Sequence, residues 1–99
     1  MDNSDLLGFE GFEWDEGNRD KNRLKHGVSE GECEEIFFNA PLLIADDPKH
    51  SDAERRFAAF GVTDGIRFLT VVFTKRQNLL RVISARDMNR KEREFYRGL

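Results

Sequence analysis

Hydrophobic and polar residues alternate with two different periods along this chain, and the change in period predicts where strands give way to helices. The segment 9–14 alternates with a period of two, so we expect a short strand there after a loose start over residues 1–8. Apolar runs in the second half predict four further strands. These are 42–45, 56–62, 66–74 and 79–85. The Asp64-Gly65 pair between the second and third of these runs is a strong hairpin signal.

Helix-start signals precede two segments between the first strand and the later ones. Asp15 is a candidate N-cap for a largely polar helix over 16–26, and Gly27 is suited to the left-handed position that follows such a helix. Ser29 and Glu32 have the spacing of a capping box, which predicts a second helix over 30–38. That helix would place Cys33, Ile36 and Phe37 on one face, and Pro41 would end it.

A last helix is expected over 89–97, where Asn89 and Glu92 form a second capping pair. Met88 and Phe95 would face the sheet, with Tyr96 as a further candidate. The order is therefore strand, two helices, four strands and a helix. Because the later strands are joined by hairpins, we expect an α+β fold, an antiparallel meander sheet covered by the helices, in one domain over 1–99.

Length and composition narrow the class of protein. The chain has 99 residues, which suits one hydrophobic core, and no apolar run approaches the roughly 20 residues of a membrane helix. The first residues are acidic and predict no secretory signal. A single cysteine cannot form an internal disulfide framework, so we expect a cytoplasmic protein with Cys33 as a small apolar residue.

The net charge of −3 conceals two halves of opposite sign. Residues 1–54 hold 15 acidic and 5 basic residues, a net charge of −10, whereas residues 55–99 hold 4 acidic and 11 basic residues, a net charge of +7. Such asymmetry is compatible with a polyanionic or acidic partner, and equally with two halves that pair with each other.

Motifs for nucleotide binding, zinc peptidase chemistry and paired cysteines are absent from the sequence. The two histidines, His26 and His50, are too few for a typical zinc site, so we expect no metal and no cofactor. The remaining reactive groups are histidine, lysine and arginine. Cleavage of RNA through its own 2′-hydroxyl needs an acid and a base, which histidine provides near neutral pH, and cations for the charge on phosphorus, which arginine provides.

Several short motifs occur in an order that resembles one family, over about residues 12–96. They are Phe12-Glu13-Trp14-Asp15, Asn22, Lys25-His26-Gly27-Val28-Ser29, Asp47-Pro48-x-His50, Glu54-x-Arg56-Phe57, Gly61, Thr74-x-Arg76, Arg81-Val82-Ile83-Ser84-Ala85-Arg86, Glu92 and Tyr96. This set resembles the BrnT toxins, small ribonucleases of bacterial type II toxin–antitoxin systems with a RelE-like fold. The chain departs from the family at Glu30-Gly31-Glu32-Cys33, where Phe-Glu-Glu-Ala is common.

The resemblance implies an endoribonuclease that cleaves mRNA and stops translation. It implies neutralisation by a BrnA-like antitoxin, in a heterotetramer of two toxins and two antitoxins that binds operator DNA through the antitoxin. Carried over position by position, the catalytic candidates are Lys25, His26, Arg81 and Arg86, and the substrate-binding candidates are Arg56, Arg76, Glu54 and Tyr96.

Each of these residues also has a structural interpretation. His26 would interact favourably with the C-terminal end of a helix, and Lys25 could simply be solvated. Arg81 and Arg86 lie five positions apart, so on a regular strand they would point to opposite faces, and either could pair with the acidic half. The alternative function is a non-catalytic module that binds an antitoxin or nucleic acid. A ribonuclease that needs the ribosome is a third possibility.

Overall fold

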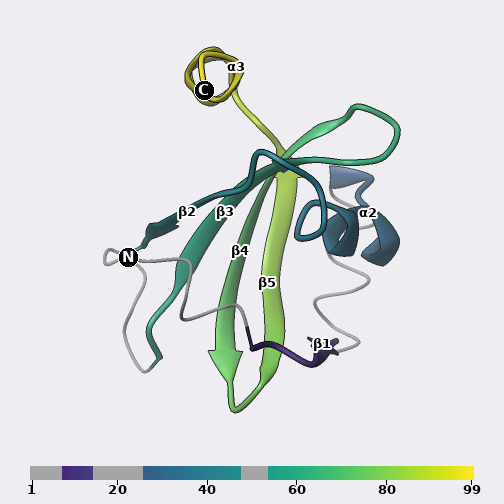
Figure 1. Cartoon of the computed structure of the whole chain (residues 1–99), viewed down its shortest axis with the longest axis vertical. Helices are drawn as coiled ribbons and strands as arrows, with labels where there is room; N and C mark the ends of the chain where they lie inside the picture. The colour runs from purple at the N-terminus through teal and green to yellow at the C-terminus, as the bar shows by residue number, and fades with distance from the viewer. Residues whose placement is uncertain (1–7, 15–25, 48–53) are drawn as a thin grey trace.

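A computed structural model describes residues 8–14, 26–47 and 54–99 (Figure 1). Its described elements are β1 (Gly11–Glu13), α2 (Glu30–Glu35), β2 (Leu43–Asp46), β3 (Phe57–Val62), β4 (Phe68–Arg76), β5 (Leu79–Asp87) and α3 (Arg90–Arg97). The strands form one five-stranded sheet in the order β1-β5-β4-β3-β2. The α+β class is therefore confirmed. The helix expected over 16–26 lies outside the described residues except for His26, and Gly27 after it is left-handed, with φ of 64°.

The sheet is mixed, whereas the sequence predicted an antiparallel one. Strands β2 to β5 are antiparallel neighbours as expected, but β1 runs parallel to β5, with Gly11 opposite Leu79 and Glu13 opposite Arg81. The hairpin argument fixes the direction of strands that follow one another closely. It does not apply to β1, which pairs with a strand more than sixty residues further along the chain, so that prediction was wrong.

One face of the sheet packs against α2 and the turn after it. Leu69, Val71 and Phe73 of β4 are fully buried there, and Cys33 and Ile36 meet them from the helix side. The prediction of an apolar helix face is confirmed, as is the Ser29–Glu32 capping box. The helix itself ends at Glu35, earlier than expected, and residues 36–38 continue as turns.

Gly61 makes the close approach of α2 to the sheet possible. A Cβ atom at this position would lie 2.7 Å from Cβ of Ile36, a distance at which one of the two segments must move. Next to this contact, the Phe37 and Phe73 rings meet edge to face with centroids 5.3 Å apart. Trp14 also packs against the core and donates to Glu34 Oε2 at 2.9 Å.

The C-terminal helix α3 stands beyond the end of the sheet (Figure 1). Met88 and Tyr96 are buried as predicted, with 2% and 4% of their surface exposed. Phe95 is 63% exposed and lines a shallow hollow with Leu43 and Phe60 of the sheet, so it faces the sheet without being buried against it. Glu92 and Tyr96, four residues apart, make the hydrogen bonds that seat the helix against Thr70 and Pro41. Among the described helices, none is long and apolar enough to cross a membrane.

Candidate active site

A β-bulge at Ile83 decides where the strand arginines point. Val72 pairs with Ser84, whereas the next residue of β4, Phe73, pairs with Val82, so Ile83 is an extra residue in β5. The alternation of buried and partly exposed residues shifts by one position at the same place. Leu80 and Val82 are buried before the bulge, and Ala85 is buried after it. An extra residue reverses the alternation of side chains beyond it.

The bulge places Arg81 and Arg86 on the same face of the sheet. Arg81 pairs with Thr74 and Arg86 pairs with Thr70, and these two threonines lie on one side of β4. The expectation that the two arginines point to opposite faces, which assumed a regular strand, was therefore wrong. We call the face opposite α2 the arginine face, because Arg81, Arg86 and, by alternation along β4, Arg76 belong to it.

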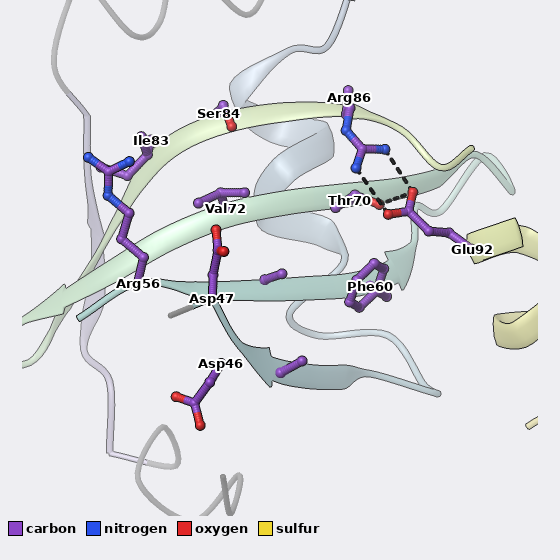
Figure 2. A pocket seen from close by; sticks show the side chains of 12 residues that line it. Asp46, Asp47, Arg56, Phe60, Thr70, Val72, Ile83, Ser84, Arg86 and Glu92 are labelled. Carbon is purple, nitrogen blue, oxygen red and sulfur yellow. Dashed lines mark hydrogen bonds and ion pairs between the residues drawn. The ribbon is translucent and has the colours of Figure 1, made fainter. Parts of the chain in front are cut away.

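A hollow of about 430 Å³ lies on the arginine face (Figure 2). Arg56 stands at one end of it and Arg86 at the other, and the carboxylate of Asp47 points inward between them. Its floor is formed by β3, β4 and β5, and its lining residues include Ala58, Phe60, Thr70, Val72, Ile83 and Ser84. The site is thus a shallow hollow with a largely apolar floor and two separated guanidinium groups at its ends.

Arg86 forms a two-pronged ion pair with Glu92 of α3. Its Nη1 and Nη2 atoms donate to the two carboxylate oxygens at 2.7 and 3.0 Å, and the Thr70 hydroxyl donates to Oε1 at 3.0 Å. Glu92 also accepts from the amide of Asn89, the N-cap residue of α3. The guanidinium of Arg86 lowers the pKa of Glu92, although partial burial opposes the shift. The capping box predicted at Asn89 is confirmed. The Glu92 carboxylate that completes it is the same carboxylate that binds Arg86.

Four predicted residues gather at the other end of the arginine face. Arg76 Nε donates to Glu54 Oε2 at 2.8 Å, and its Nη2 atom reaches the second oxygen. Arg76 accounts for most of the lowering of the pKa of Glu54, and the charges of Arg81 and Arg56 act in the same direction. The structure thus brings Glu54, Arg56, Arg76 and Arg81 within electrostatic range of one another.

His26 lies apart from these groups, at the end of β5 on the side of α2. Nη2 of Arg67 donates to the His26 carbonyl at 3.2 Å and to Asp87 Oδ2 at 3.0 Å, so the His26 backbone lies close to Asp87. Asp87 directly follows Arg86 in β5. His26 and Arg86 therefore approach the end of one strand from opposite faces. Lys25, the other catalytic candidate of this motif, lies outside the described residues.

Tyr96, predicted to bind substrate, lies in the packing of α3. Its hydroxyl donates to the carbonyl of Pro41, and its ring meets Phe68 edge to face with centroids 5.7 Å apart. Burial raises its pKa. These contacts attach α3 to the segment that follows α2, and a role for Tyr96 in substrate binding stays a prediction. Within the parts of the chain that the structure describes, no group of three metal-ligating side chains is found.

Comparison with known proteins identifies the family. A family profile described as "Ribonuclease toxin, BrnT, of type II toxin-antitoxin system" matches residues 14–92. The chain belongs to the BrnT ribonuclease toxins. A crystal structure of the ribonuclease toxin BrnT from Brucella abortus is similar to it, with a TM-score of 0.59, 26% sequence identity, and coverage of 81% of this chain and 97% of the Brucella chain. No curated protein matches the chain by sequence.

The match to BrnT includes every predicted site residue except Tyr96, which lies beyond residue 92. It confirms the family inferred from the sequence motifs. The roles of the individual residues, and the RelE-like character of the fold, stay predictions.

One prominent residue of this BrnT chain was not among the predicted site residues. Arg67 lies just before β4 and binds two carboxylates and two backbone carbonyls, those of His26 and Gly27. The only available signal was a charged residue at the edge of an apolar strand, which needs partners if it is partly buried. Its partners lie 20 to 41 residues away in the sequence, so no local motif could identify them.

Proposed function

We propose that the chain is an endoribonuclease toxin that cleaves mRNA without a metal ion and thereby inhibits translation. Membership in a family described as ribonuclease toxins supports the class of activity. The observation that carries the proposal is the bulge at Ile83, because it gives Arg81 and Arg86 a common face on which to contact one RNA backbone.

The proposed reaction uses the 2′-hydroxyl of RNA as its nucleophile. A base removes the 2′-hydroxyl proton, a bond forms between O2′ and phosphorus, the bond between phosphorus and O5′ breaks, and an acid protonates O5′. His26 is the proposed acid–base group, and Lys25, its neighbour in the sequence, is proposed to help stabilise the negative charge on phosphorus. Arginines of the arginine face bind the phosphate oxygens and stabilise the negative charge of the transition state, with Arg86 and Arg81 as the principal candidates and Arg56 and Arg76 in support.

The carboxylates at the site are compatible with phosphate binding if phosphate competes with them for the arginines. Glu92 and Glu54 each hold an arginine by two hydrogen bonds, the geometry in which arginine also binds phosphate. An incoming phosphate therefore meets a guanidinium that is already oriented, and it must share that guanidinium with a carboxylate or displace the carboxylate.

Cleavage of a short RNA by the purified protein in EDTA tests this proposal. We expect 2′,3′-cyclic phosphate products, no cleavage of a substrate that carries 2′-deoxyribose at the cleavage site, and strongly reduced rates for His26→Ala and Arg86→Lys. Arg90→Lys is the matched control, because Arg90 forms an exposed ion pair with Glu94 away from the hollow. Cleavage only with added divalent metal would contradict the mechanism. Binding without cleavage, both alone and with translating ribosomes, would favour a non-catalytic binding module.

We further propose that a BrnA-like antitoxin neutralises this toxin in the cytoplasm, in a complex of two toxins and two antitoxins that binds operator DNA through the antitoxin. The toxin–antitoxin description of the family supports the existence of such a partner. Co-expression with the product of the adjacent open reading frame, followed by light scattering on the purified complex, measures the stoichiometry. A mass that corresponds to any other ratio would refute the tetramer.

A further inference from the structure

Arg67 uses all three nitrogens of its guanidinium to bind protein acceptors. Nε and Nη2 donate to the two oxygens of Asp87 at 2.7 and 3.0 Å, and Nη1 donates to Glu32 at 3.2 and 3.3 Å. Nη1 also donates to the Gly27 carbonyl at 2.9 Å, and Nη2 donates to the His26 carbonyl at 3.2 Å. These contacts, from here the Arg67 network, join β4, β5, α2 and the His26–Gly27 backbone.

The two carbonyls in this network are groups that need an external partner. They lie where a helical residue is followed by left-handed Gly27, and the last carbonyls of a helix have no partner within it. A basic side chain at such a position satisfies both oxygens.

The segment just after His26 is held from its other end as well. Val28 is 1% exposed, and the Ser29 amide donates to Glu32 Oε1 at 3.1 Å. The same carboxylate accepts from Arg67, so the capping box of α2 and the Arg67 network share Glu32. The backbone that carries His26 is thus fixed against the ends of β4 and β5, beside Asp87.

We propose that Arg67 is a positioning residue that holds the His26 backbone at the end of β5 and thereby fixes the direction from which the imidazole projects. The inference rests on the proposed function of His26 as acid–base group. Arg67 itself is not expected to contact RNA, because its donors are already occupied by protein acceptors. A displacement of about 1 Å in a reacting group can lower a rate by about 100-fold, so the position of this backbone bears directly on the rate.

Arg67→Lys preserves the positive charge but removes the planar guanidinium that reaches several acceptors at once. The lysine ammonium group is a compact point charge and cannot reach two carboxylates and two carbonyls at once. We therefore expect Arg67→Lys to lower kcat for RNA cleavage by at least about tenfold with KM changed by less than about twofold, as for loss of an interaction that acts on the transition state only. Arg55→Lys is the matched control, because Arg55 forms an exposed ion pair with Asp46, with side chains 62% and 39% exposed.

Proton NMR of the imidazole groups tests the inference independently of nuclease activity. The chain has only two histidines, so His50→Gln assigns the His26 signal without ambiguity. We expect Arg67→Lys to shift or broaden the His26 signal while the His50 signal stays in place, and Arg55→Lys to leave both unchanged. An unchanged His26 signal in Arg67→Lys would overturn the proposal.

The kinetic result separates this inference from the proposed function. If the wild-type protein cleaves no RNA while the His26 signal responds to Arg67→Lys, the positioning role stands and the proposed function fails. If the loss caused by Arg67→Lys appears in KM, Arg67 contacts RNA and the positioning role is refuted. Asp87→Asn, which loosens the Arg67 network while preserving its shape, carries the same NMR test if Arg67→Lys does not fold.

Discussion

The ion pair between Arg86 and Glu92 gives the most quantitative test of how this site is built. Glu92→Gln removes the charge but keeps an oxygen that can accept from the Asn89 amide, so the capping box of α3 survives. Hydrogen bonds to charged groups contribute about 1.5–3 kcal/mol. The Glu92 side chain is 19% exposed and that of Arg86 is 42% exposed, so screening by water reduces the expected loss to about 1–2 kcal/mol.

Urea unfolding measures this loss directly. For a domain of this size, the midpoint of Glu92→Gln should fall by about 1 M relative to the wild type. Glu94→Gln is the control, since the Arg90–Glu94 pair has side chains 86% and 67% exposed and should contribute no more than about 0.5 kcal/mol. Equal losses in the two variants would refute the reasoning, because they would show that the bidentate contact adds nothing to an exposed pair.

The pH dependence of the difference in stability between wild type and Glu92→Gln provides a second check. Arg86 lowers the pKa of Glu92 in the folded protein below its ordinary value of 4.5. A carboxyl group whose pKa is lowered by folding stabilises the protein above its unfolded pKa, and this contribution disappears as the pH falls through the folded pKa. The gap in stability between wild type and Glu92→Gln should therefore be full at pH 7 and shrink below about pH 4.5. A gap of constant size down to pH 3 would show that the charge of Glu92 is not its source.

Three further predictions follow from packing and backbone geometry. Gly61→Ala should destabilise the fold by about 1–3 kcal/mol in urea unfolding, because the added Cβ would lie 2.7 Å from Cβ of Ile36. Gly31→Ala is the control. Its Cβ would meet nothing nearer than 4.0 Å, so it should stabilise α2 by up to about 1 kcal/mol. Gly27→Ala should cost about 1–2 kcal/mol by the same measurement, since φ is 64° there. Burial raises the pKa of the Cys33 thiol to about 12, so iodoacetamide at pH 8 should label it only as fast as the protein unfolds, and rapid labelling of the native state would contradict this.

Local features of this fold were predictable because their causes lie within a few residues. Both capping boxes depend on a side chain and an amide three positions apart, and both are present as predicted. The left-handed conformation of Gly27 and the tight turn at Asp64-Gly65 have equally local causes. Burial of Cys33 follows from the helical period alone.

The predictions that were wrong concern features whose causes lie far away in the sequence. The direction of β1 depends on its pairing with β5, and the exposure of Phe95 depends on how closely α3 approaches β2 and β3. The bulge at Ile83 could not be predicted from the sequence for another reason. Ile83 is an ordinary strand residue, so nothing in the run of residues 79–85 shows that it has no partner in β4.

The arginines of this toxin divide into two kinds according to their acceptors. Arg86 and Arg76 each bind a single carboxylate in a geometry that a phosphate can replace, and their side chains are 42% and 43% exposed. Removing either carboxylate should therefore tighten RNA binding while it weakens the fold, which a filter-binding assay on Glu92→Gln would measure. Arg67 is different, because its nitrogens are shared among four protein groups and its side chain is only 29% exposed. A phosphate would have to break the Arg67 network to bind there, so we expect RNA to reach Arg86 and Arg76 and not Arg67.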